Sequence, residues 1–209
     1  MFLSSFVLRL IALITMTVDH VGHFLYPHIL WLRIVGRLAF PLFLFLCNEA
    51  YKYTRDRRKY ALRLLIMGLG MHAVMLVASG PDNANIFITL AVCFITVWSL
   101  DEKQYLITAL AIAGGMALSM DYGLYAVGLM LVFHYLEGRW YLIAPLWVGL
   151  NALGVALWHY HIIQHFSIIS LLFIVLYNHK PGEKRFKYLF YLYYPLHIAV
   201  LYLLSGGLS

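Results

Sequence analysis

The sequence predicts an all-α membrane protein, a polytopic bundle of about nine transmembrane helices. Hydrophobic residues make up 63% of its 209 residues and charged residues only 11%, whereas soluble domains are about 45–50% apolar and about 25% charged. Apolar runs close to the roughly 20 residues that cross a bilayer recur along the whole chain. No polar stretch is long enough to fold by itself, so residues 1–209 are expected to form a single transmembrane domain.

Short polar or basic turns divide the apolar runs into the expected helices. In chain order the turns are Pro27-His28, "YKYTRDRRKY", "GPDNAN", "DEK", Asp121-Tyr122-Gly123, "EGR", "HYH" and "NHKPGEKRFK". The helices between them are expected at roughly 5–26, 30–53, 60–79, 86–100, 104–120, 123–136, 140–158, 162–177 and 188–204. Pro41 should kink the second. The first lacks a small-residue cleavage site and contains Asp19, so it is expected to be a mature helix and not a signal peptide.

The distribution of Lys and Arg predicts the orientation, because short basic loops stay in the cytoplasm. With nine spans and residues 51–60 inside, the basic loop residues share the cytoplasmic side: Lys52, Arg55, Arg57, Arg58, Lys59, Lys103, Arg139, Lys180, Lys184, Arg185 and Lys187. The opposite loops contain no Lys or Arg. We therefore expect a multi-pass protein of the bacterial inner membrane, with its N-terminus inside and its C-terminus outside.

Ionisable residues gather at one depth of the first two expected helices. These residues are Asp19, His20, Arg33 and Arg37. Because a charged group is costly inside a bilayer, such residues face a cavity, pair with one another or carry a function. Four ionisable residues at the same depth in the membrane therefore indicate a candidate functional site. Other expected helices add polar residues to a chamber that opens outward: Asn85, Asp121 and His197.

Arg9 lies near the inner end of the first expected helix, 11 residues before His20. At 1.5 Å per residue this separation is about 16 Å. Eleven steps of about 100° also return nearly to the same face of the helix. The pattern predicts one polar stripe, shared with Met16 and His23, that links the two sides of the membrane.

The chemistry of these residue types favours a histidine-centred group transfer. A carboxylate beside a histidine orients a general base and stabilises its charged form. Neighbouring residues of a helix point about 100° apart, so Asp19 orients either His20 or one of the arginines. Arg33 and Arg37 are suited to hold an oxyanion or an anionic substrate group. We expect His20 to be the base, with His23 as the alternative.

The remaining histidines do not indicate a metal site. His159, His161 and His165 have no thiolate or carboxylate beside them, so no metal is expected there. A lone histidine on a membrane helix usually forms a hydrogen bond between helices. That role, or a plain loop position, is expected of His72, His134 and His179. Topology and attraction to anionic lipid would by themselves produce the basic loops, so the bilayer is an expected partner and a nucleic acid is not.

Several motifs together resemble one protein family along nearly the whole chain. They are "LRLIALITMTVDHVGHFLYP", "RIVGRLAFPLFLFL", "TRDRRKYALRLL", "NIFITL", "DYGLYAVGLM" and "YYPLHIAVL". This combination resembles the TraX family, which is associated with conjugal transfer. Its best-known member acetylates the amino terminus of conjugative pilin.

A second, more distant resemblance concerns the ten residues between Arg9 and His20. They match the Arg/Lys-x10-His signature of the type-three integral membrane acyltransferases, which move acyl groups from a cytoplasmic donor to extracytoplasmic acceptors. The resemblance implies that His20 is the catalytic histidine and that an acyl-CoA is the donor. We expect the donor to be acetyl-CoA, and we expect Asp19 and Arg37 to be catalytic together with His20. The acceptor or oxyanion pocket is then assigned to Arg33, Asn85, Asp121 and His197. The phosphates of the donor are expected on the inner basic face, at Arg9, Arg55, Arg57, Arg58, Arg63 and Lys184.

The expected protein is thus a TraX-like acetyltransferase that acts on an amine or hydroxyl at the outer face. The acceptor is a pilin-like peptide or a glycan. Two other classes of protein remain open. One is a proton- or anion-coupled transporter, which would use the polar chamber without binding acyl-CoA. The other is an assembly factor of a membrane complex, for which His20 would be dispensable.

Overall fold

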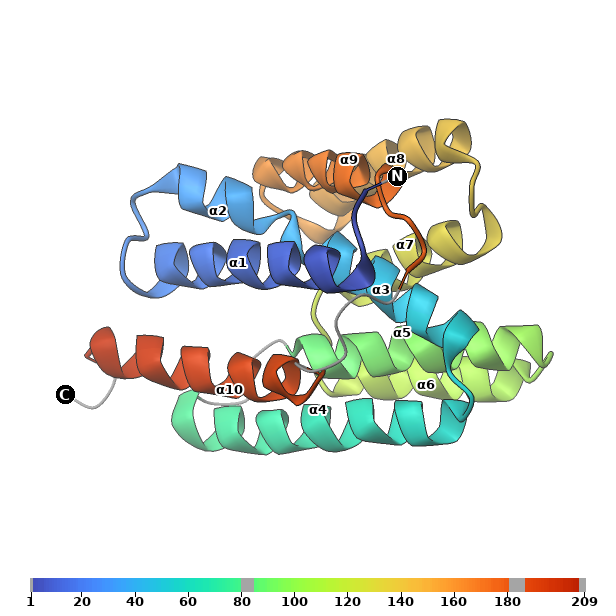
Figure 1. Cartoon of the computed structure of the whole chain (residues 1–209). Coiled ribbons are helices and arrows are strands. Elements are labelled where there is room, and N and C mark those ends of the chain that lie inside the picture. The colour runs from blue at the N-terminus through green and yellow to red at the C-terminus, as the bar shows by residue number, and fades with distance from the viewer. Residues whose placement is uncertain (1, 80–84, 181–186, 207–209) are drawn as a thin grey trace. The chain divides into compact units, whose positions relative to one another are not determined.

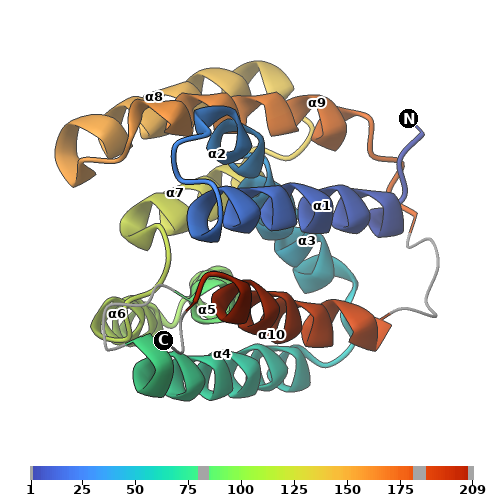
Figure 2. The ribbon, with the colours of Figure 1, turned by 90° about the vertical axis from the view of Figure 1, so that its left-hand side faces the viewer.

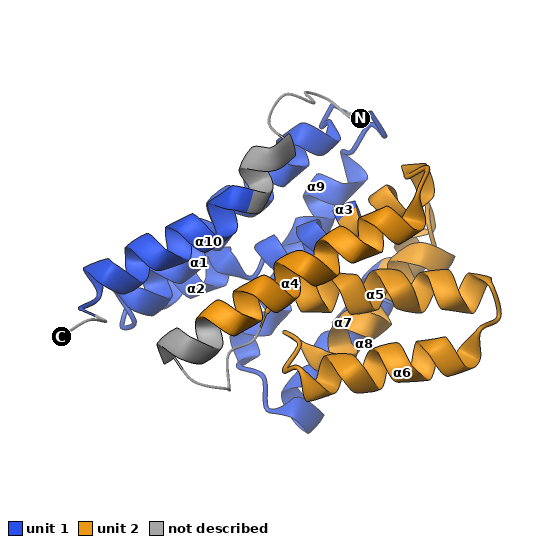
Figure 3. Ribbon diagram, turned by 90° about the horizontal axis from the view of Figure 1, so that it is seen from below, with its two compact units in different colours: residues 1–46, 144–209 blue, residues 47–143 orange. Residues whose placement is uncertain are grey.

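The computed structural model describes residues 2–79, 85–180 and 187–206. Within these ranges the chain is all-helical, with ten α-helices, one 3-10 helix and no β-strand. The chain divides into two compact units, residues 1–46 with 144–209 and residues 47–143 (Figure 3). The elements are α1 Ser5–Phe24, α2 Leu30–Gly36, α3 Ala39–Tyr53, α4 Arg57–Ser79, α5 Ile86–Asp101, α6 Tyr105–Ala117, α7 Gly123–Tyr135, α8 Trp140–Trp158, η1 Ile162–Ile169, α9 Ser170–Val175 and α10 Lys187–Leu204.

Each of the nine expected segments is helical in the described residues, but the second is broken. α2 ends at Gly36 and α3 begins at Ala39. Pro41 has no N–H to donate to the carbonyl of Arg37, and its ring crowds that turn. The kink predicted at Pro41 therefore appears as a break about one turn earlier, and Arg37 lies in it.

The segment expected as an α-helix at 162–177 begins as the 3-10 helix η1 instead. Side chains three residues apart eclipse each other in a 3-10 helix. Gln164, Ser167 and Ser170 have this spacing, and all three are buried. Asn151 of α8 donates from Nδ2 to Oγ of Ser167 at 3.1 Å. The 3-10 winding thus aligns one polar seam, which an α-helix would spread around its surface.

In the unit formed by residues 1–46 and 144–209, α1 lies between α2 and α10 (Figures 1 and 2). Two glycines allow the close approach of α1 and α2. A Cβ on Gly22 would lie 2.7 Å from Cβ of Leu32, and one on Gly36 would overlap the side chain of Asp19. Each helix therefore contributes one glycine to the contact, and the carboxylate of Asp19 rests directly over the backbone of Gly36.

In the unit formed by residues 47–143, α5 packs against α4, α6 and α7. Phe94 and Val97 of α5 are fully buried. His134 of α7 is a hydrogen-bonding partner between helices, as predicted: Nδ1 lies 3.0 Å from Oδ1 of Asn48, and Nε2 lies 3.3 Å from Oδ1 of Asp101. His72 differs, because its buried Nδ1 has no hydrogen-bond partner among the described residues.

Three helical stretches among the described residues are long and apolar enough to cross a membrane: Ser5–Phe24, Leu30–Tyr53 and Trp140–Trp158. Shorter apolar helices cover Ile86–Asp101, Tyr105–Ala117, Gly123–Tyr135, Ile162–Val175 and Leu192–Leu204. A helix that is apolar on all sides requires an apolar environment. The amino-acid composition of these helices is that of a membrane protein.

We expect Gly36→Ala to destabilise the protein, because the added methyl group would displace Asp19 or separate α2 from α1. Overpacking of this kind costs about 1–3 kcal/mol. Gly149→Ala in α8 is the matched control, since a Cβ there meets nothing within 4 Å, and alanine is the better helix former. Thermal unfolding of both variants in one detergent measures the difference. Equal melting temperatures would contradict the close contact of α1 and α2.

Candidate functional site

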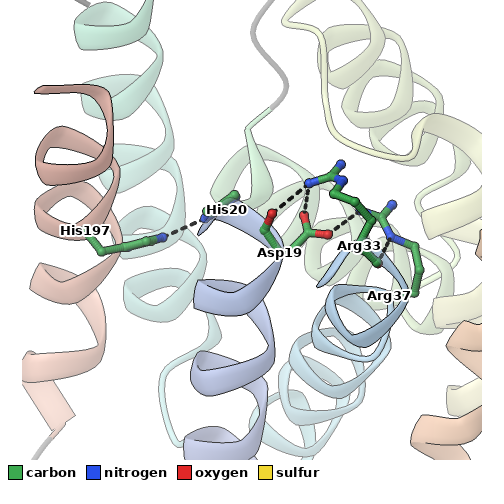
Figure 4. Close-up of polar contacts among 5 residues, drawn as sticks. All are labelled: Asp19, His20, Arg33, Arg37 and His197. Carbon is green, nitrogen blue, oxygen red and sulfur yellow. Dashed lines mark hydrogen bonds and ion pairs between the residues drawn. The ribbon is translucent and has the colours of Figure 1, made fainter. Parts of the chain in front are cut away.

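One carboxylate joins two arginines at the α1–α2 contact (Figure 4). Nη1 of Arg33 donates to Oδ2 of Asp19 at 2.7 Å and to its backbone oxygen at 3.0 Å. Nη2 of Arg37 donates to Oδ1 of Asp19 at 2.8 Å, and Nε of Arg37 donates to the carbonyl of Arg33. The three side chains are between 14% and 26% exposed. The cluster is therefore mostly shielded from water and carries one net positive charge.

His20 pairs with a histidine far along the chain. Its Nδ1 lies 2.7 Å from Nε2 of His197 in α10. The two rings are close to coplanar, with centroids 4.9 Å apart and planes 23° apart, as an in-plane hydrogen bond between ring nitrogens requires. Phe24 and Tyr194 present their rings to His20 in edge contacts. His20 thus has a fixed position on the face of α1 that meets α10.

Asp19 and His20 serve different partners, although they are neighbours in sequence. Figure 4 shows the arginines on one side of α1 and His197 on another. The sequence left open whether Asp19 orients the histidine or the arginines. The structure resolves this choice, because both carboxylate oxygens of Asp19 bind guanidinium groups. His20 has His197 as its partner instead.

Sequence reasoning missed two residues, Tyr193 and Thr17. The ring of Tyr193 stacks on His197 at 5.0 Å between centroids, and its carbonyl lies 2.8 Å from Nδ1 of His197. Its hydroxyl lies 2.7 Å from Oγ1 of Thr17 in α1. The signal for Tyr193 was its position four residues before His197, one turn away on the same face of a helix.

Asn85 and Asp121 belong to the other unit, so their predicted place in one chamber with His20 stays a prediction. Asn85 is fully buried at the start of α5. Its Oδ1 accepts from the backbone N–H of Phe87, and its Nδ2 donates to the carbonyl of Gly68 at 2.7 Å. The backbone oxygen of Asp121 accepts from Oγ1 of Thr89. These contacts assign Asn85 to capping a helix and joining it to α4.

The residues predicted to bind the donor divide between the two units. Arg9 lies in α1, on the helix that carries His20. The others lie in or just before α4: Arg55, Arg57, Arg58 and Arg63. Of these, Arg55 and Arg58 are exposed, whereas the guanidinium of Arg57 lies 4.2 Å from the ring centroid of Tyr51. Lys184 lies outside the described residues.

Asp56 partly balances this basic segment. Its Oδ1 accepts from the backbone N–H of Lys59 at 2.9 Å, and its Oδ2 lies 3.4 Å from Nζ of the same lysine. The backbone hydrogen bond and the lysine charge lower the pKa of Asp56, so that it stays ionised at the start of α4. The segment from Arg55 to Arg63 nevertheless keeps a net positive charge, because it has one carboxylate and four arginines.

The unit formed by residues 1–46 and 144–209 thus holds a histidine suited to proton transfer and a clamped pair of arginines. Arg33 binds Asp19 through Nη1 alone. Its Nε and Nη2 make no hydrogen bond within the described residues, so they offer donors to an anionic oxygen. His23 is exposed, one turn after Asp19.

Comparison with known proteins identifies one relative that aligns along nearly the whole chain and one that aligns with less than a third of it. The chain is 32% identical over 233 aligned positions to the "Probable fimbrial assembly protein FimC, serogroup H1" of Dichelobacter nodosus, covering 95% of this chain and 94% of that protein. It is 37% identical over 62 positions to the "Uncharacterized protein RP591" of Rickettsia prowazekii (strain Madrid E), covering 30% of this chain and 23% of that protein. No solved structure gives a significant match.

The model of one family, described as "TraX protein", matches residues 4–205. That range includes α1 with Asp19 and His20, the arginines of α2 and the histidine of α10. Together with the full-length relative, this match confirms the family that the sequence motifs resembled. The chain belongs to the TraX family.

Proposed function

We propose that the protein is an acetyltransferase of the bacterial inner membrane that crosses the bilayer nine times, with its N-terminus inside. It moves an acetyl group from cytoplasmic acetyl-CoA to an amine or hydroxyl at the outer face. The observation that carries the proposal is the fixed position of His20. Its Nδ1 is paired with His197, and the residue before it on α1, Asp19, binds two arginines.

The donor enters from the cytoplasmic side. Its phosphates bind the basic residues at the inner face, Arg9 and the arginines at the start of α4, since guanidinium groups match phosphate oxygens in charge and geometry. The acetyl-bearing arm extends along α1 from Arg9 toward His20, a rise of about 16 Å. The charge asymmetry of the loops supports this orientation.

The reaction forms a C–N bond to the acceptor and breaks the C–S bond of the thioester. The acceptor amine attacks the thioester carbonyl, so that a C–N bond forms while the amine gives a proton to His20. Arg33 stabilises the negative charge on the carbonyl oxygen through its unused Nε and Nη2. The C–S bond then breaks, and the thiolate of CoA takes up the proton. Arg37 holds Asp19, and through it Arg33, in place.

The acceptor we propose is the amino terminus of a pilin-like subunit. The relative that aligns with 95% of this chain is named a probable fimbrial assembly protein. An amino group outside the membrane suits a base near the outer end of α1. Acetylation would remove the positive charge of that terminus before the subunit joins a fibre.

The same relative favours a second candidate function. An assembly factor without catalysis would bind fimbrial subunits and would need no acyl donor. Such a protein would support fimbrial assembly when His20 is replaced, provided that the variant folds. The enzyme proposed here would instead lose acetyl transfer when His20 is replaced.

We expect His20→Ala to abolish acetyl transfer and to leave the protein folded. His20→Gln keeps a similar size but provides no base, so it should be inactive as well. His23→Ala is the matched control, because His23 is exposed and its ring makes an edge contact with Phe24 instead of a hydrogen bond with another histidine. The assay follows labelled acetyl from acetyl-CoA to a peptide with a free amino terminus. Transfer by His20→Ala at the parent rate would refute the mechanism.

Arg33→Lys tests the role of the guanidinium. Lysine keeps a charge beside Asp19 but lacks the two nitrogens that Arg33 leaves unused. Loss of one oxyanion donor lowers turnover by about 10²–10³, and we expect a decrease of that order with an unchanged melting temperature. Arg37→Lys is the comparison, expected to lower the melting temperature because the Nε bond to the carbonyl of Arg33 is lost. Full activity of Arg33→Lys would exclude an oriented role.

A further inference from the structure

The histidine pair contains enough hydrogen bonds to determine where its protons lie. A backbone carbonyl only accepts hydrogen bonds, and the carbonyl of Tyr193 lies 2.8 Å from Nδ1 of His197. Nδ1 of His197 therefore carries a hydrogen. A neutral imidazole has one N–H, so Nε2 of neutral His197 is an acceptor.

This assignment determines the tautomer of His20 in turn. Nε2 of His197 and Nδ1 of His20 are 2.7 Å apart, and two acceptors do not pair at that distance. Nδ1 of His20 must therefore carry the hydrogen that lies between the rings. The lone pair of neutral His20 is left on Nε2, which has no hydrogen-bond partner within the described residues.

The surroundings hold His197 in this role. Its ring is nearly parallel to that of Tyr193, with an interplanar angle of 12°, and is nearly coplanar with that of His20, with an angle of 23°. The hydroxyl of Thr17 donates to the carbonyl of Leu13 at 2.8 Å, so its oxygen is left to accept from the hydroxyl of Tyr193 at 2.7 Å. Tyr193 is thereby tied to α1 by its side chain, while its carbonyl orients His197.

We propose that His197 is a positioning residue that fixes His20 as the Nδ1–H tautomer and makes Nε2 its reactive atom. The chain of hydrogen bonds runs from the carbonyl of Tyr193 through His197 to His20. The Nδ1–H form is the minor tautomer of a free histidine side chain, so the protein selects it. In the reaction proposed above, on which the catalytic part of this inference rests, the acceptor proton goes to Nε2.

Nitrogen NMR of the full-length protein tests the tautomer without any assay of activity. The ¹⁵N shift of an imidazole nitrogen distinguishes a protonated from an unprotonated atom. At pH 8, above the ordinary histidine pKa of about 6.5, ¹⁵N-histidine-labelled protein should show His20 with Nδ1 protonated and Nε2 bare. The signals are assigned by their loss in His20→Gln. A parent spectrum with Nε2 of His20 protonated would overturn the proposal.

Two replacements of His197 separate positioning from packing. His197→Phe keeps an aromatic ring for stacking but offers no acceptor, so His20 should lose its tautomer preference. His197→Gln places a carbonyl oxygen near the position of Nε2 and should restore it. We expect kcat to decrease by about 10²–10⁴ in His197→Phe, with little change in KM, and to recover in large part in His197→Gln. Equal loss of kcat in both variants would assign His197 a packing role and overturn the proposal.

The two readouts keep this inference apart from the proposed function. A parent spectrum with the Nδ1–H form, together with no acetyl transfer by the parent, would support the tautomer and refute the acetyltransferase. A parent protein that transfers acetyl while His20 is in the Nε2–H form would support the acetyltransferase and refute the tautomer assignment. Because the parent spectrum decides the tautomer by itself, a variant that fails to fold does not leave the question open.

Discussion

The ion pairs between the carboxylate of Asp19 and two guanidinium groups determine how α1 and α2 pack and where the two arginines lie. Charges inside an apolar helix bundle are tolerated only when they are paired. Here the single carboxylate of Asp19 forms an ion pair with each of two arginines. Both ion pairs require α2 to lie against α1 at a short distance, which the lack of a side chain at Gly36 permits. The polar cluster and the helix contact are therefore one feature. Neither can change without the other.

Helix geometry then divides the work between neighbouring residues. Side chains at consecutive positions point about 100° apart, so Asp19 faces α2 while His20 faces α10 (Figure 4). Sequence adjacency suggests a carboxylate–histidine pair, but the structure has a histidine–histidine pair and a separate carboxylate–arginine cluster. In the proposed reaction the proton acceptor and the oxyanion donor are thus held by different helices, and α1 connects them.

Much of the fold was predictable, because apolar length and turn residues mark the ends of membrane helices. The nine helical segments and the pairing of Asp19 with arginine followed from periodicity and matched depth. The pairing of His20 with His197 did not, since 177 residues separate them and only packing of α10 on α1 brings them together. The 3-10 winding of η1 was missed because apolar periodicity outweighed the three-residue spacing of Gln164, Ser167 and Ser170.

The proposed mechanism requires one site to use a donor from the cytoplasm and an acceptor on the outer side of the membrane. Sealed inside-out vesicles that contain the full-length protein test it most directly, with labelled acetyl-CoA in the medium and a peptide with a free amino terminus in the lumen. We expect label on the luminal peptide with the parent protein and none with His20→Ala. Absence of label in parent vesicles, or label only when donor and peptide share one side, would contradict it.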